Sequence, residues 1–275
     1  WVPYQSSDSI DLRKPLHIRL LATDNTERKY TLKINVHTME GDTLKWVAVD
    51  SHDIISGAHP MKALPWNGEM AVLVNDGSAV LMMTHPQGNV GEWARQVTDL
   101  PVTADVSSLS KGPRNLFVST TDGGLYSSAD GLAWTRLFQY DGLRLVGVSH
   151  DKLYAKYNGV INSIYIGAGG WAVEPLDAEL SFLPDEEIAA ITYAQNESLT
   201  RMIIVGNRAV DTDTCAVVWS KCWTDFEEED SESWMHYSKS WDNTMPLPMF
   251  TQMNLMYYDN MLMLAGGESK DGTVE

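Results

Sequence analysis

Two carboxylates in the segment DTDT are the first residues whose type and spacing could bind a ligand. Asp211 and Asp213 lie two positions apart, and carboxylate oxygens on a flexible loop are ligands that Ca²⁺ prefers. The segment lacks the further oxygen ligands of a known calcium loop, so a solvated hairpin turn is the competing interpretation. The acidic run FEEEDSES, residues 226–233, is interpreted as an insertion loop, which also explains the 63-residue spacing between Trp171 and Trp234, and a cation site is the alternative. The sequence therefore predicts no metal site.

The motifs of the common catalytic classes are missing from the sequence. It has no Gly-x-Ser-x-Gly elbow, no phosphate loop and no His-Glu-x-x-His helix. Its seven histidines are scattered, and no pair has the spacing of metal ligands on a helix or strand. A sialidase-like enzyme would need an arginine cluster, a tyrosine nucleophile and an acid, and the Arg-x-Pro segment of such enzymes is absent. We therefore assign no catalytic residue and no cofactor.

The charge balance argues against polyanionic partners. The 275 residues include 20 basic and 37 acidic side chains, which gives a net charge of −17. Such a chain repels nucleic acid and anionic membrane surfaces at long range. The apolar content of 44% supports a buried core, and no apolar run approaches the length of a membrane span. We expect no nucleic-acid partner and no membrane insertion.

The elements that must hold any site recur along the chain. Four segments share the order short apolar strand, turn with Asn, Asp or Gly, second strand: MAVLVNDGSAVLMM, NLFVSTTDGGLYSS, KLYAKYNGVINSIYIG and RMIIVGNRAVDTDTCAVVW. A fifth, NMLMLAGGESKDGTVE, begins and is cut off. Their turn glycines are Gly77, Gly123, Gly159, Gly206 and Gly266. Repeats of roughly 40 to 50 residues with about four strands are typical of β-propeller blades. The sequence therefore predicts an all-β fold, with a β-propeller over residues 39–275 whose last blade is truncated.

A tryptophan follows each complete hairpin of the series. Trp93, Trp134, Trp171 and Trp234 are 41, 37 and 63 residues apart. A four-stranded blade buries both of its faces against its neighbours and is not stable alone. An indole ring offers a large apolar surface to cover the seam between two blades. We therefore predict that these four tryptophans are structural residues at the seams.

The segment SSADGLAW predicts how one of these tryptophans is positioned. Gly131 fits a hairpin turn that needs a positive φ, and Ser127 and Asp130 can hydrogen-bond the turn backbone. The order Ser127, Gly131, Trp134 resembles the Asp-box of sialidase-type propellers, Ser-x-Asp-x-Gly-x-x-Trp. The aspartate of that motif falls on Ala129, and Asp130 stands one position later. The resemblance implies an outer hairpin away from the ligand face, and so a structural role.

Residues 1–38 have a different pattern. We predict strands at residues 16–22 and 30–37, joined by the turn TDNTERK. Two strands cannot form an independent domain, so they either pack on the propeller or end a sandwich whose beginning is missing. The pattern resembles the last hairpin of the immunoglobulin-like modules in secreted Bacteroidetes proteins. The resemblance implies that residues 1–38 are the terminal hairpin of an immunoglobulin-like β-sandwich.

Most of the chain resembles a secreted Bacteroidetes family of unknown function. Its members have an N-terminal immunoglobulin-like module and a C-terminal kelch- or Asp-box-like propeller, and their precursors are typically lipoproteins. The resemblance implies a secreted or cell-surface location. We expect a non-catalytic binding or adhesion protein that recognises a glycan or a surface protein with the propeller face.

The alternative function is a carbohydrate-active enzyme of sialidase or kelch-propeller type. The two functions predict different residues at the central mouth of the propeller. An enzyme would bring together two carboxylates, or a tyrosine with an acid. A binding protein would present aromatic rings and amides without that pair.

Overall fold

A computed structural model gives the structure of the chain. It describes residues 14–23, 26–32, 55–56, 59–86, 92–149, 152–167, 169–196, 198–208, 216–224, 232–237, 247, 249, 251, 253–258 and 261–265. These residues form strands β1 to β20 and one short 3₁₀ turn, η1 (Leu180–Phe182), so the predicted all-β class is confirmed. Within these ranges no helix has the length and apolar composition that crossing a membrane requires.

The chain divides into two compact units, Trp1–His52 and Asp53–Glu275. The predicted boundary between residues 38 and 39 lies outside the described residues. In the first unit, β1 (Leu16–Leu21) pairs antiparallel with β2 (Glu27–Leu32). The second strand begins earlier than predicted.

The early start of β2 has a physical cause. The Ala22 N–H donates to the Thr26 carbonyl at 2.9 Å and closes the hairpin directly before Glu27. Glu27 then lies opposite Leu21, and its carboxylate is 3.7 Å from Arg19 Nη1 and 3.0 Å from Lys29 Nζ. Charged residues that we assigned to the turn therefore form the beginning of a strand.

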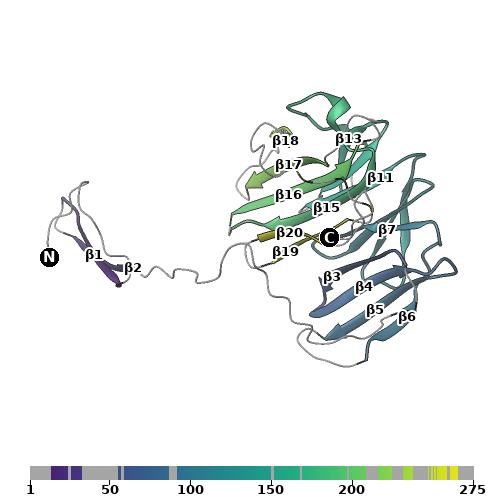
Figure 1. Ribbon diagram of the computed structural model, residues 1–275, viewed down its shortest axis with the longest axis horizontal. Helices are drawn as coiled ribbons and strands as arrows, with labels where there is room; N and C mark the ends of the chain where they lie inside the picture. The colour runs from purple at the N-terminus through teal and green to yellow at the C-terminus, as the bar shows by residue number, and fades with distance from the viewer. Residues whose placement is uncertain are drawn as a thin grey trace. The chain divides into compact units, whose positions relative to one another are not determined.

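The described residues of the second unit form five antiparallel sheets that follow one another along the chain, and we call them blades 1 to 5 (Figure 1). Blade 1 contains β3 (Met61–Trp66), β4 (Glu69–Asn75), β5 (Val80–Pro86) and β6 (Ala94–Val97). Blade 2 contains β7 (Ala104–Lys111), β8 (Leu116–Thr120), β9 (Gly124–Ser128) and β10 (Thr135–Gln139). Blade 3 contains β11 (Arg144–Ser149), β12 (Lys152–Tyr157), β13 (Val160–Tyr165) and β14 (Ala172–Val173). Blade 4 contains β15 (Glu186–Ala194), β16 (Leu199–Asn207), β17 (Val217–Thr224) and β18 (Met235–Tyr237), and the described part of blade 5 is β19 (Asn254–Tyr258) and β20 (Met261–Ala265).

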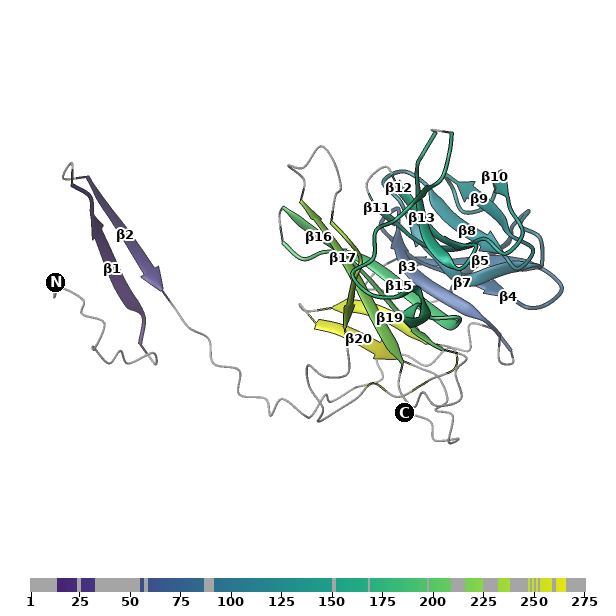
Figure 2. The same ribbon diagram turned by 90° about the horizontal axis from the view of Figure 1, so that it is seen from above.

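The first strands of consecutive blades are neighbours. β3 packs against β7, β7 against β11, β11 against β15, and β15 against β19, which both views place beside it (Figures 1 and 2). Within blades 1 to 4 each strand pairs with the next one in sequence. This is the arrangement of β-propeller blades, with first strands toward a common axis and fourth strands outside.

The antiparallel order gives every blade two distinct ends. The first strand begins at the same end as the turn between the second and third strands, as the pairing of Ala104 with Thr120 shows in blade 2. We call this end of the unit the mouth face. The turn between the third and fourth strands lies at the opposite end.

The four tryptophans of the repeat occupy the same position in their blades. Each one directly precedes the fourth strand: Trp93 before β6, Trp134 before β10, Trp171 before β14 and Trp234 before β18. Trp134 packs in the apolar core between blades 1 and 2, Trp171 in the core between blades 2 and 3, and Trp234 in the core between blades 3 and 4. Trp93 packs with Val72, Val74 and Met83 on the face of blade 1 that points away from blade 2.

One predicted turn glycine has a different role. Gly206 lies inside β16, opposite Val217, and a Cβ at Gly206 would stand 2.6 Å from Cβ of Pro184. A glycine is needed there because Pro184 approaches the strand closely, and sequence alone does not distinguish this need from a turn. Gly77, Gly123 and Gly159 do lie in the turns between second and third strands, and Gly266 lies outside the described residues.

Two equivalent turns offer a matched test of close packing on the mouth face. Gly123 and Gly159 have φ values of 83° and 77°, but only Gly123 is crowded: a Cβ there would stand 1.8 Å from the Tyr140 carbonyl oxygen, whereas nothing lies within 4 Å at Gly159. Gly159→Ala should cost about 1 kcal/mol of unfolding free energy, through the positive φ alone. Gly123→Ala should cost roughly 2 kcal/mol more, because the backbone at Tyr140 must move. Urea unfolding measures both, and equal losses would contradict the close approach.

Candidate functional site

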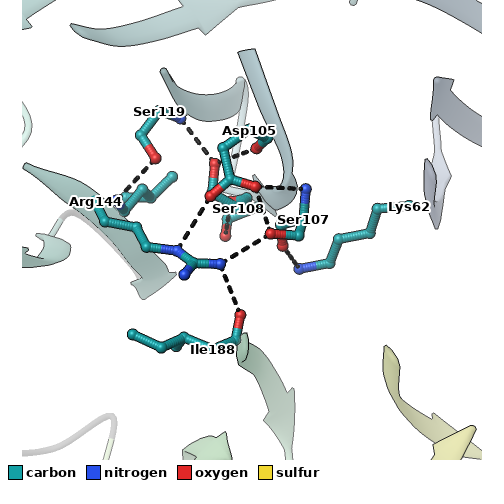
Figure 3. A network of polar contacts seen from close by, with 9 residues as sticks. Lys62, Asp105, Ser107, Ser108, Ser119, Arg144 and Ile188 are labelled. Carbon is teal, nitrogen blue, oxygen red and sulfur yellow. Dashed lines mark hydrogen bonds and ion pairs between the residues drawn. The ribbon is translucent and has the colours of Figure 1, made fainter. Parts of the chain in front are cut away.

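Polar groups from four blades meet where the first strands begin (Figure 3). We call the side chains of this set the axial network: Lys62 on β3, Asp105, Ser107 and Ser108 on β7, Ser119 on β8, and Arg144 on β11. β15 contributes the carbonyl oxygens of Ile188 and Ala190. The contacts between them show that these strands begin at the same end of the unit.

Arg144 is the centre of the axial network. Its Nε lies 3.1 Å from Asp105 Oδ2, and its Nη2 donates to Ser107 Oγ at 3.0 Å and to the Ile188 carbonyl at 3.1 Å. The Ser107 hydroxyl and backbone N–H both donate to Asp105 Oδ1. One guanidinium thus ties blade 3 to blades 2 and 4 with charge-assisted bonds in a fixed fork geometry.

Lys62 brings blade 1 into the same network. Its Nζ donates to the Ser107 carbonyl at 2.9 Å and lies 3.5 Å from the Ala190 carbonyl on blade 4. Burial lowers the pKa of the Lys62 ammonium from 10.5 to about 8. The Asp105 carboxylate opposes this shift of the pKa, and the nearby Arg144 charge adds to it.

Irregularities in three of the first strands shape the network. The pairing register shifts between Asp105 and Ser110 in β7, between Leu145 and Gly147 in β11, and between Glu186 and Ala189 in β15. β-Bulges of this kind bend a strand and re-aim its side chains, and they are frequent beside functional sites.

Serine hydroxyls satisfy backbone groups around the bulge of β7. Ser108 Oγ donates to the Asp105 carbonyl at 2.7 Å and accepts from the Ser119 N–H at 2.9 Å. Ser119 Oγ accepts from the Leu145 N–H on β11 at 3.0 Å. Ser108 and Ser119 are both buried, so these bonds replace ladder bonds where water has little access.

Two aromatic rings also lie on the mouth face. Tyr140 follows β10 and is 39% exposed, and its ring centroid lies 5.5 Å from that of Tyr157 at the end of β12. Arg144 is paired across the strands with Lys156, which directly precedes Tyr157. We call Tyr140 and Tyr157 the rim tyrosines. They pair blade 2 with blade 3 on this face and leave the Tyr140 ring partly exposed.

The Asp-box-like hairpin lies at the opposite end of blade 2. Asp130 Oδ1 accepts from the N–H groups of Leu132 and Ala133 at 2.8 and 2.9 Å. These backbone bonds, with a smaller contribution from the Ser128 hydroxyl, hold the pKa of the Asp130 carboxyl below its usual value. Gly131 has a φ of 81°, and its carbonyl accepts the indole N–H of Trp134 at 2.9 Å.

The serine that supports this turn is Ser128, the neighbour of Ser127. Ser128 Oγ accepts from the Gly131 N–H at 2.8 Å and donates to Asp130 at 3.0 Å. Ser127 instead lies opposite Thr135 in the pairing of β9 with β10. Ser128 and Asp130 keep the two-residue spacing of serine and aspartate in the Asp-box motif, one position later in the sequence. This spacing matters because residues two positions apart project to the same side of an extended chain.

The residues with possible ligand chemistry divide between described and undescribed parts of the chain. Asp211 and Asp213 lie outside the described residues, as does most of the acidic run at 226–233. Among the residues with a described structure, no group of three or more His, Cys, Asp or Glu is arranged to hold a metal ion. The axial network was missed from the sequence. Its signal was a charged residue within the first two positions of three first strands, at Lys62, Asp105 and Arg144.

The pairing of Asp105 with Arg144 predicts a large cost for removing the carboxylate. Asp105→Asn leaves Arg144 and Lys62 as close, uncompensated cations, and we expect a loss of about 2 kcal/mol or more in unfolding free energy. Asp185→Asn is the control, because the Lys156 Nζ to Asp185 Oδ1 pair at 2.8 Å has a carboxylate side chain that is 55% exposed. That exposed pair should contribute less than about 1 kcal/mol. Equal losses in urea unfolding would contradict a central role for Arg144.

The pKa of Lys62 predicts how stability changes with pH. The pKa is about 8 in the fold and 10.5 ordinarily, so between these values the unfolded chain binds more protons than the folded chain. The contribution of Lys62 to the unfolding free energy therefore rises with pH in this range, by at most about 1.4 kcal/mol per pH unit. Lys62→Met removes this slope. Parallel stability curves for the two proteins between pH 7.5 and 10 would refute the lowered pKa.

Three solved structures are similar to the chain in fold. A thermostable family-43 glycoside hydrolase has 11% identity and a TM-score of 0.40, over 80% of this chain and 83% of that one. The N-terminal domain of Nup159 has 12% identity and a TM-score of 0.38, over 74% of this chain and 56% of that one. PorZ of Porphyromonas gingivalis, a surface component of the type-IX secretion system, has 11% identity and a TM-score of 0.28, over 78% of this chain and 34% of that one. All three TM-scores are below 0.5, so these similarities carry no argument about function.

The sequence itself shows the family. No curated protein matches the chain. The chain spans 56% of the length of the first two solved structures that it matches. Residues 40–275 match the DUF6242 beta propeller domain, which confirms the predicted propeller, and the chain belongs to that family.

Proposed function

We propose that the propeller is a non-catalytic binding module that recognises a glycan or a surface protein on its mouth face. The observation that carries this proposal is the axial network, in which four blades hold Lys62, Asp105 and Arg144 in one place. The side chains of Arg144 and Asp105 keep 28% and 21% of their surface exposed, so a ligand can reach them. Groups fixed by several rigid elements lose little freedom when a ligand binds.

The chemistry of the network favours binding over glycoside hydrolysis. Hydrolysis of a glycosidic bond usually uses two carboxyl groups on either side of the scissile bond. The axial network contains one carboxylate, Asp105, and both of its oxygens face partners within the protein, Arg144 and Ser107. These groups are arranged to hold one another and a ligand in place.

The rim tyrosines support recognition of a ring or an apolar surface. Tyrosine combines a flat apolar face with a polar hydroxyl and loses little side-chain entropy when it binds. Tyr140 is exposed, and its ring packs against Tyr157 and, at 6.2 Å, against Phe138. The ring of Tyr140 is therefore held by its aromatic neighbours and is still accessible to a ligand.

We further propose a location and a context for this module. The hairpin β1–β2 would be the end of an immunoglobulin-like module over residues 1–38, and residues 39–275 would be the propeller, with a kelch- or Asp-box-like repeat. The support is the resemblance of the sequence to secreted Bacteroidetes proteins, together with the Ser128–Asp130 hairpin of blade 2. In that setting the binding module would act at the cell surface, as an adhesion protein.

Two assays on the full chain test the proposed function. A glycan array should show selective binding, and a panel of fluorogenic glycosides should show no turnover. Tyr140→Ala should weaken array binding at least about tenfold, because aromatic anchors carry much of the affinity of a binding surface. Tyr165→Ala is the matched control, since Tyr165 is 46% exposed but ends β13 at the end of the blade away from the mouth face. Turnover of any glycoside would establish the enzyme alternative, and a folded chain that is silent in both assays would overturn glycan recognition.

A further inference from the structure

We propose that the ligand carries a carboxylate, as in a uronic acid residue of an acidic glycan, and that this carboxylate binds between Lys62 and Arg144. The inference rests on the proposed binding function of the mouth face and names the class of its ligand. It follows from an inventory of donors and charges in the axial network.

The network has hydrogen-bond donors to spare. An ammonium has three N–H groups, and Lys62 directs two of them at the carbonyls of Ser107 and Ala190. A guanidinium has five N–H groups, and among the described residues those of Arg144 that donate hydrogen bonds are on Nη2, while Nε forms an ion pair with Asp105 without a hydrogen bond. No described residue accepts a hydrogen bond from Arg144 Nη1 or from the third N–H of Lys62. These groups can therefore donate to an acceptor on a ligand.

The acceptors of the network, in contrast, are already engaged. Asp105 Oδ2 faces Arg144, and Asp105 Oδ1 accepts from the hydroxyl and the N–H of Ser107. The Ser107 carbonyl accepts from Lys62. A ligand therefore meets donors in this place, and a ligand group rich in acceptors suits it best.

The charges lead to the same conclusion. Lys62 and Arg144 converge on the two sides of Ser107, one on its carbonyl and the other on its hydroxyl (Figure 3). Asp105 neutralises one of the two positive charges, so the network is positive within a chain of net charge −17. Lys62 is in addition half-buried, which makes its charge costly in the absence of an anion. An anion bound between the two cations relieves their repulsion and gains charge-assisted hydrogen bonds.

A sugar acid fits the surroundings better than a polyanion. A chain of charge −17 repels highly charged ligands at long range, whereas a single carboxylate experiences little of this repulsion. The rim tyrosines lie on the same mouth face as the network, at the ends of β10 and β12, where a further residue of an oligosaccharide could contact them. A uronic acid offers a carboxylate for the cations and an apolar ring face for the tyrosines.

Isothermal titration of the full chain with matched probes tests the inference. The probes are an oligogalacturonate, the same oligosaccharide as its methyl ester, and an acidic peptide of similar length. We expect the acid to bind at least about tenfold more tightly than the ester, because the ester lacks the charge. Binding of the peptide without binding of the sugar acid would overturn the assignment to a glycan. Equal affinity for acid and ester would overturn the inference while leaving the proposed binding function intact.

Two charge variants locate the carboxylate. Lys62→Gln should lower the affinity for the acid about tenfold and leave the affinity for the ester unchanged. Lys152→Gln removes the same charge from the first residue of β12, at the end of blade 3 away from the mouth face, and should change neither affinity. Loss of acid binding in both variants would show long-range attraction in place of a site. If Lys62→Gln does not fold, the comparison of acid with ester on the unaltered chain still decides. Selective binding on the glycan array with no affinity for the acid would refute the inference alone.

Discussion

The burial of two apolar faces by every blade is the constraint on which this propeller depends. Blade 2 shows it most directly: Leu116 and Val118 of β8 face the core shared with blade 1, while Phe117 faces the core shared with blade 3. Alternate residues of one strand thus belong to two different cores, and a blade with only one neighbour would leave half of them in water. Trp134, Trp171 and Trp234, each directly before a fourth strand, close such cores near the outer edge of the blades.

Packing the blades against one another brings their first strands close together at the axis, where some backbone groups lose their ladder partners. The axial network supplies partners for these groups. First strands from several blades crowd together there, and the bulges in β7, β11 and β15 interrupt their ladders. Interrupted ladders leave backbone N–H and C=O groups that must find partners. The hydroxyls of Ser108 and Ser119, the ammonium of Lys62 and the guanidinium of Arg144 supply them. Since Arg and Lys have more donors than the backbone requires here, a network that stabilises the fold also has the composition of a binding site.

The sequence predicts the features that recur in every blade, and it does not reveal those that occur only once. The hairpins, their turn glycines and the four tryptophans recur because every blade must solve the same packing problem, so comparison of the sequence with itself could find them. The pairing of Lys62, Asp105 and Arg144 does not recur, because each blade contributes a different residue to one shared place. Gly206 shows that a recurring pattern can also mislead. Its neighbours in the sequence are typical of a turn, but the glycine is needed because of Pro184, which lies 22 positions away in the chain. Which serine supports the turn at Gly131, Ser128 and not Ser127, likewise depends on which side of β9 faces the turn.

The division between periodic and non-periodic residues also corresponds to the two ends of each blade. The hairpin between third and fourth strands carries the repeated elements, with Asp130 holding the turn and Trp134 reaching back to the Gly131 carbonyl. The opposite end carries the residues of the axial network, which differ between blades. The close approach of the first strands of blades 1 to 4 holds these residues against one another. A propeller can therefore change the charges at its mouth with little effect on these hairpins, because the two sets of residues lie at opposite ends of the blade. Substitutions near the beginning of the first strands would therefore alter the charge of the axial network first. In this chain Lys62, Asp105 and Arg144 stand within the first two positions of three consecutive first strands, and together they give the axial network one more positive than negative charge in an acidic protein.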